Sequence, residues 1–140
     1  MQRLLYESAL RRRSAELMRQ WSALGVSVTR VSHEQHWALK SRMRGGRSLQ
    51  PLRPLMDIKT EVRSFAGGRD LVSIMGWSTI ADPVLLVPMH QLLRHLSQME
   101  VIYRDGFIVF NEPASKALHI DYDEADGTQC QVIVLSASGA

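Results

Sequence analysis

The sequence contains one cysteine and no long apolar run. These two features argue against a disulfide-bonded protein and against a membrane-spanning protein. Cys130 is the only cysteine, so the chain can form no internal disulfide, and an unpaired thiol suits a reducing compartment. The longest apolar runs, such as residues 84–87, are far shorter than the roughly 20 residues that a membrane-spanning helix needs. The N-terminal segment has no small-residue cleavage site, which is the wrong layout for a secretory signal. We therefore expect a cytoplasmic protein without a transmembrane segment.

The signatures of common catalytic sites are also absent. The chain has no G-x-x-x-x-G-K-[ST] phosphate loop, no G-x-G-x-x-G dinucleotide loop and no G-x-S-x-G nucleophile elbow. These absences favour a protein that is not an enzyme and has no cofactor and no bound metal. Lysine is scarce as well, with three Lys against 14 Arg, a bias that we expect of a GC-rich bacterial genome.

The amino-acid composition is that of an ordinary globular protein. The 140 residues are 45% hydrophobic and 22% charged. A chain of this length buries roughly two thirds of the surface that it exposes when unfolded, which is enough for one core. We predict a single domain over residues 1–140.

Residues 4–24 are predicted to form an amphipathic helix that ends at Gly25. Its apolar residues recur at helical spacing: Tyr6, Leu10, Leu17, Trp21 and Leu24. The opposite face carries Arg11, Arg12, Arg13 and Arg19, and we interpret this run of charge as a solvated face.

Two further helices are indicated. Ser32 with Gln35 three residues later is typical of a capping box, which predicts a helix over 33–44, although its thin apolar face leaves an extended arm as an alternative. Pro88 is well placed as the first residue of a helix over 89–99, whose apolar stripe is Met89, Leu92, Leu93, Leu96 and Met99.

The remaining segments predict strands, and together with the helices they indicate an α+β fold. The run 26–31 is predicted to be a strand and 45–57 a loop, while 58–77 is either a hairpin or a short helix ending at Gly67 and then a strand. The last third predicts an antiparallel meander with strands at 101–104, 107–110, 117–123 and 130–136. Turns are expected at 105–106 and 126–127.

Charge is unevenly distributed along the chain. Residues 1–53 carry 11 basic and three acidic groups, whereas residues 100–140 carry two basic and seven acidic groups. Segregated charge can steer and select a complementary partner. The acidic strand and turn, with Asp121, Asp123, Glu124 and Asp126, are therefore our predicted protein-binding residues. A basic toxin or nuclease would be a fitting partner, as for a bacterial immunity or antitoxin protein.

The basic segment 30–53 supports an alternative function. Arginine binds phosphate and an aromatic side chain stacks on unpaired bases, so single-stranded nucleic acid is a legitimate partner. The residues of this alternative site are Arg30, Lys40, Arg42, Arg44, Arg47 and Arg53, interleaved with Trp37.

A small enzyme with a His/Asp site is the third hypothesis. His119 lies two residues from Asp121 on a predicted strand and could form the imidazole–carboxylate pair that orients a general base. His33 and His36 stand in H-E-Q-H, one residue short of the zinc-protease pattern, and we interpret them as surface histidines.

Two features near the C-terminus are interpreted as structural. Residues 121–128 have the alternating carboxylates of a calcium loop, but Ala125 stands at the third ligand position, so we expect a solvated hairpin turn. Cys130 has no adjacent basic residue and is expected to be a buried, unreactive side chain.

Overall fold

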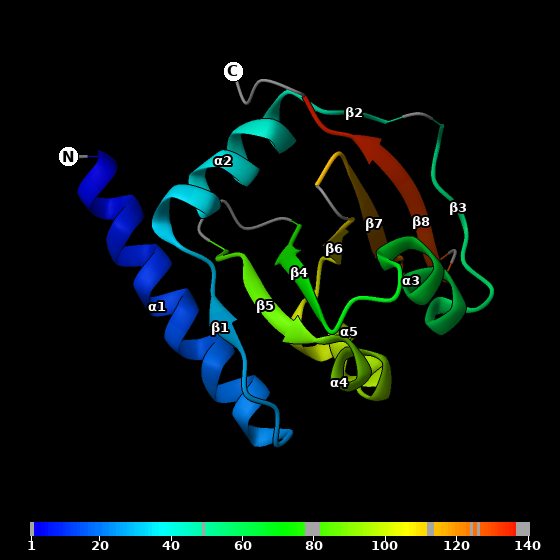
Figure 1. Ribbon diagram of the computed structural model, residues 1–140, viewed down its shortest axis with the longest axis horizontal. Helices are drawn as coiled ribbons and strands as arrows, with labels where there is room; N and C mark the ends of the chain where they lie inside the picture. Colours follow the sequence, from blue (N-terminus) through cyan, green and yellow to red (C-terminus); the bar gives the residue numbers. More distant parts are fainter. Residues whose placement is uncertain are drawn as a thin grey trace.

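The computed structural model describes residues 2–48, 50–77, 82–111, 114–123, 125 and 127–136, with side chains for all of these except 2–4 and 123. It confirms the α+β fold (Figure 1). The helices are α1 (Gln2–Ala23), α2 (His33–Arg44), α3 (Ile58–Ala66), α4 (Met89–Arg94), the 3-10 turn η1 (Leu96–Gln98) and α5 (Met99–Ile102). The strands are β1 (Thr29–Arg30), β2 (Arg47–Ser48), β3 (Arg53–Pro54), β4 (Leu71–Gly76), β5 (Leu85–Pro88), β6 (Phe107–Phe110), β7 (Lys116–Asp123) and β8 (Gly127–Val134).

The strands form one antiparallel sheet in the order β1-β5-β4-β6-β7-β8-β2, and β3 also pairs with β8. The predicted meander corresponds to β6-β7-β8, in which Phe107 lies opposite Ile120 and Ile120 opposite Cys130. Strand β1 forms one edge of the sheet, and β2 and β3 cover β8 at the other. All three short strands come from the basic N-terminal part of the chain.

The sheet has an apolar core on each face. Alternation along β7 sends Leu118 and Ile120 into one core, together with Leu17 and Trp21 of α1 and residues of α3, α4 and α5. Ala117 enters the other core, which contains Leu39 of α2 and residues of β4, β6 and β8. Figure 1 shows α1 along the β1 side of the sheet and α3 and α4 near one end. Cys130 is buried in the first core, as predicted, and burial raises the pKa of its thiol.

The two N-terminal helices form where they were predicted. In α1, Leu10, Leu17 and Trp21 are buried. The alternative of an extended arm at 33–44 is wrong, because the Ser32 side chain caps α2 by accepting a hydrogen bond from the Gln35 amide.

Residues 89–102 are helical, but they do not form one helix. They divide into α4, η1 and α5, and the predicted strand at 101–104 is wrong because 99–102 is helical. Five apolar residues spaced along this segment enter one core: Met89, Leu92, Leu96, Met99 and Ile102. Pro88 does not begin the helix, since it pairs with Leu71 as the last residue of β5.

Three other segments differ in detail from the prediction. Only Thr29 and Arg30 of the run 26–31 are in a strand, and the predicted loop 45–57 contains β2 and β3. For 58–77 the second alternative is correct, with α3 followed by β4 and Gly67 at the end of the helix with φ of +76°. Pairing with β8 supplies the stability that the short sequences of β2 and β3 lack, and this long-range contact has no local signature.

Candidate binding site at one end of the sheet

A hollow of about 440 Å³ lies beside the C-terminal end of β4. Helix α1 contributes one wall, and the segment from α5 to the turn before β6 contributes another. The residues that line the hollow are Arg13, Glu16, Gln20, Trp77, Asp82, Val101, Ile102, Tyr103, Arg104, Asp105 and Gly106. We refer to it as the Trp77 hollow.

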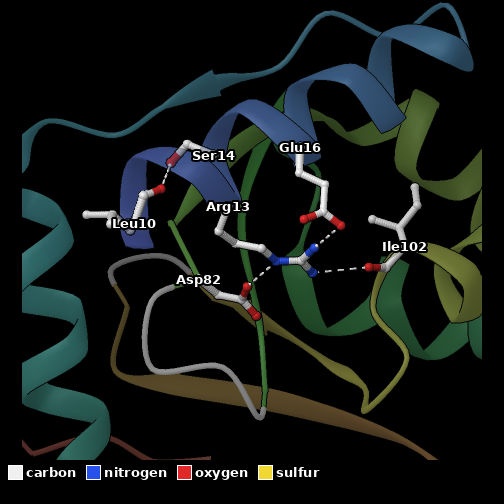
Figure 2. Close-up of polar contacts among 6 residues, drawn as sticks. All are labelled: Leu10, Arg13, Ser14, Glu16, Asp82 and Ile102. Carbon is white, nitrogen blue, oxygen red and sulfur yellow. Dashed lines mark hydrogen bonds and ion pairs between the residues drawn. The ribbon is translucent and has the colours of Figure 1, made fainter. Parts of the chain in front are cut away.

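The inner wall is held by an ion pair between Arg13 and Asp82 (Figure 2). The Arg13 guanidinium donates from Nε to Asp82 Oδ1 at 2.6 Å, from Nη1 to Glu16 Oε1 at 3.0 Å and from Nη2 to the carbonyl oxygen of Ile102 at 3.2 Å. Arg13 therefore connects α1 to the segment before β5 and to α5. The interpretation of Arg13 as part of a solvated face is wrong, although Arg11, Arg12 and Arg19 are exposed.

Asp82 is 2% exposed, and burial raises the pKa of its carboxyl group while the hydrogen bond and charge of Arg13 act against that change. Lys40 on α2 also stabilises the charged form of Asp82. Burial in turn lowers the pKa of Lys40 to about 8. Lys40 is half-buried, and the negative charge of Asp82 acts against this decrease in its pKa.

Gly76 is required by the close approach of Asp82. A Cβ atom at this position would collide with the Asp82 carboxylate and would stand 3.0 Å from Cδ1 of Tyr103. The absence of a side chain at the end of β4 thus leaves the space that the buried carboxylate fills.

Two residues that line the hollow also carry polar atoms that are buried beneath its surface. Tyr103 is 2% exposed, and its Oη lies toward Trp21 Nε1 without the geometry of a hydrogen bond. Gln20 Oε1 is buried and has no donor among the described residues.

Trp77 forms the rim of the hollow and stacks on His119. The two ring centroids are 3.7 Å apart with an interplanar angle of 16°, and Trp77 remains 41% exposed. His119 is buried on β7, and burial lowers its pKa to about 4, so the imidazole is neutral at pH 7. Its Nδ1 lies 3.1 Å from Nε2 of Gln131, so Gln131, and not Asp121, supplies that hydrogen bond.

The predicted acidic residues lie at the same end of the sheet as the hollow, as far as the structure describes them. Asp121 is half-exposed, and Gly106 packs so closely on the backbone of Ile120 and Asp121 that a Cβ would not fit. Asp123 ends β7, whereas Glu124 and Asp126 lie outside the described residues. The acidic end of β7 thus borders the turn that lines the hollow.

The structure does not bring the predicted nucleic-acid-binding residues together on one edge. Arg30 is on β1, at one edge of the sheet, while Arg47 and Arg53 are on β2 and β3 at the other. Arg53 pairs with Glu61 at 2.8 Å, and Arg42 donates from Nε to the Ser136 carbonyl. Arg44 is exposed near the end of α2.

The aromatic residue of that segment is also engaged within the fold. Trp37 donates from Nε1 to His33 Nε2 at 2.9 Å, and its ring lies 5.0 Å from that of Tyr6. His33 is exposed as predicted, but the surface interpretation of His36 is wrong because α2 turns His36 into the protein. Burial lowers the pKa of His36 to about 4. Among the described residues, no group of three His, Cys, Asp or Glu could hold a metal ion.

Comparison with known proteins finds no matching family model, no similar curated protein and no similar solved structure. In the described part of the chain, no helix combines the length and apolar character needed to cross a membrane.

Sequence reasoning missed most of the hollow. Trp77 was predicted only as the end of a strand, and Tyr103 as part of one. A signal did exist at Asp82, because an acidic residue followed by Pro83 and a wholly apolar strand indicates a carboxylate near the core that needs a basic partner. The partner itself, Arg13, is 69 residues away and has no local signature.

Proposed function

We propose that this chain is a non-enzymatic protein-binding module of the bacterial immunity or antitoxin kind. Its partner would be a basic protein, such as a toxin or nuclease, that docks over the Trp77 hollow and the acidic end of β7. Cytoplasm is the proposed compartment, in keeping with the unpaired Cys130.

The observation that carries this proposal is the exposed apolar rim of a polar hollow. Trp77 is 41% exposed and Val101 is 69% exposed, and both line the same depression. Tryptophan is enriched among the residues that dominate binding energy at protein interfaces, above all where it sits in a pocket ringed by polar groups. An exposed Trp that is already held by stacking on His119 loses little conformational entropy when a partner covers it.

The charge of this end of the sheet supports a basic partner. Asp105 lines the hollow, Asp121 is half-exposed next to it, and Asp123 ends the same strand. Complementary charge accelerates association and disfavours wrong partners. The neutral, buried His119 does not offset these acids at pH 7.

The test uses charge reversal at the acidic end of β7. Tagged wild-type chain and the double variant Asp121→Lys/Asp123→Lys are used to capture proteins from the lysate of the source cells, with and without nuclease. The matched control Glu34→Lys/Asp70→Lys reverses two exposed acids elsewhere, with Asp70 preceding the opposite end of β4. We expect one stoichiometric protein that survives nuclease, binds wild type and control alike, and associates about tenfold more slowly with the β7 variant.

Two results would contradict the proposal. If the β7 variant and the control associate with the captured protein at the same rate, the acidic end is not the docking surface. If only nucleic acid is retained, or every captured protein is lost on nuclease treatment, the basic segment 30–53 is the functional surface. In that case affinity for single-stranded RNA should fall steeply with salt.

A further inference from the structure

We propose that the partner covers the part of the sheet that α2 leaves open, on the face opposite α1, and that a basic segment of the partner lies there against Trp77 and Asp121. The proposal rests on the proposed function, which supplies the basic partner. It adds which of the two faces of the sheet the partner covers. We refer to the five side chains of this surface as the open face: Trp77, His119, Asp121, Gln129 and Gln131.

Strand alternation and register place the members of the open face on one side of the sheet. Ile120 of β7 enters the core on the α1 side, so its neighbours His119 and Asp121 point to the other side, where α2 lies. On β8, Gln131 and Gln129 lie directly opposite these two residues. Cross-strand partners share a face, so the four side chains form one block across the two strands.

Helix α2 covers only one end of this side of the sheet. Ala117 of β7 and Ile133 of β8 are buried in the core that contains Leu39 of α2. Farther along the same two strands, Asp121 and Gln129 are half-exposed. Within a few residues the surface thus changes from an apolar core to accessible polar side chains.

Trp77 gives the open face an apolar contact of fixed orientation. Its ring centroid lies 3.7 Å from that of His119, and 41% of the residue is exposed. His119 is held in turn, because its Nδ1 lies 3.1 Å from Gln131 Nε2, and Ser48 Oγ donates to Gln131 Oε1 at 2.7 Å. An exposed tryptophan that is already fixed loses little conformational entropy when a partner packs on it.

The charge of the open face favours a basic segment as its occupant. Among the described strand residues, this face carries the carboxylate of Asp121 and no basic side chain. Arg53, for example, pairs with Cys130, which is buried in the core on the α1 side. The basic residues of β2, β3 and β7 all lie at positions of that other face: Arg47, Arg53 and Lys116. A positively charged partner therefore meets attraction at the open face without repulsion from its strands.

The probe for this surface is a synthetic peptide of alternating lysine and alanine residues. A glutamine–alanine peptide of the same length is the uncharged control. Binding to the full chain is followed by the NMR signals of the three indole N–H groups, and that of Trp77 is assigned with Trp77→Phe. We expect a saturable shift of the Trp77 signal with a dissociation constant on the order of 0.1 to 1 mM, and no comparable shift for Trp37. The uncharged peptide should bind at least about tenfold more weakly.

Two neighbouring positions on β8 distinguish the two faces of the sheet. Gln129 belongs to the open face, whereas Thr128 lies opposite Tyr122, which packs against the core on the α1 side. Both Gln129 and Thr128 are half-exposed. Gln129→Lys should weaken binding of the basic peptide roughly fivefold. Thr128→Lys adds the same charge on the other face and should change the affinity by less than about twofold at about 0.15 M salt, where distant charges are screened.

The inference is overturned if the basic peptide gives no saturable shift of the Trp77 signal, or if the uncharged peptide binds equally well. Equal weakening by Thr128→Lys and Gln129→Lys would also overturn it, because the contact would then not distinguish the faces. A shift of the Trp77 signal on dilution of the chain alone would show that a second copy covers the open face, and would overturn it as well.

Failure of this inference is distinguishable from failure of the proposed function. A captured protein may depend on Asp121 and Asp123 yet be weakened by Thr128→Lys and not by Gln129→Lys. That result would leave the function standing and show that the open face is not the surface covered. Peptide binding that Gln129→Lys weakens, with no protein captured by the wild-type chain, would support the open face and remove the proposed function.

Discussion

Arg13 and Gly76 show how strongly single residues in this chain depend on groups far away in the sequence. Arg13 looks like one of three consecutive surface arginines, yet it alone turns inward to a carboxylate 69 residues away. Gly76 is the last residue of β4, and the Asp82 carboxylate occupies the position that a Cβ atom at Gly76 would need. A buried ion pair tolerates the loss of neither partner well, because the remaining charge is left unpaired.

Replacing Gly76 with alanine should therefore destabilise the protein. The added Cβ would overlap the Asp82 carboxylate, which is held by Arg13, and we expect a loss of about 1 to 3 kcal/mol in the free energy of unfolding. Urea denaturation measures this change.

The matched control for this substitution is Gly68→Ala, since a Cβ there meets no atom within 4 Å. We expect the control to change stability by less than about 0.5 kcal/mol. Equal effects of the two substitutions would mean that the packing of Asp82 on Gly76 is not what stabilises this corner.

At the scale of the elements, capping residues predict the ends of a helix better than an apolar stripe predicts its length. The capping residue Ser32 and the glycine after the helix both stand where α2 starts and stops. The apolar stripe from Met89 to Met99 was predicted as one helix, but the segment divides into α4, η1 and α5. The apolar stripe thus identifies core residues, although it does not predict that the helix is interrupted.

Loss of the cap should weaken α2. Ser32→Ala removes the side-chain oxygen that accepts from the Gln35 amide, and we expect the free energy of unfolding to fall by about 1 kcal/mol. Ser27→Ala, an exposed position outside any helix or strand, is the control and should be close to neutral. A similar loss in both variants, measured by urea denaturation, would argue against the cap.

At the scale of the whole molecule, one sheet separates two apolar cores. Two histidines are buried in the protein. His36 projects from α2 and His119 from β7, and burial lowers the pKa of each from 6.5 to about 4. Both are therefore neutral in the folded protein at pH values where an unfolded chain already binds protons. The stability of the fold as a whole is consequently linked to pH.

Stability should fall as the pH is lowered from 6.5 toward 4. Because the folded pKa lies below the unfolded value, the stability contributed by each neutral histidine is complete above pH 6.5 and is lost toward pH 4. The loss amounts to roughly 2 kcal/mol for each histidine at pH 5. Asp82 acts in the opposite sense, since its raised pKa favours the folded state at lower pH.

Urea denaturation at pH 7 and pH 5 measures this dependence. His119→Gln and His36→Gln should each reduce the difference between the two pH values, whereas exposed His90→Gln should leave it unchanged. An unchanged difference in both buried variants would show that these imidazoles are not the source of the pH dependence.

The sequence by itself determined the α+β fold, the first two helices with the cap of α2, and the β6-β7-β8 meander. These features depend on periodicity, capping and turn residues that lie within a few positions of one another. Only the tertiary structure decided that Arg13 pairs with Asp82, that Trp77 stacks on His119, and that Arg30 and Arg47 are on strands at opposite edges of the sheet. Those relations depend on which strands become neighbours, and strand order is set by the sum of all long-range contacts in the sheet, to which a local pattern contributes little.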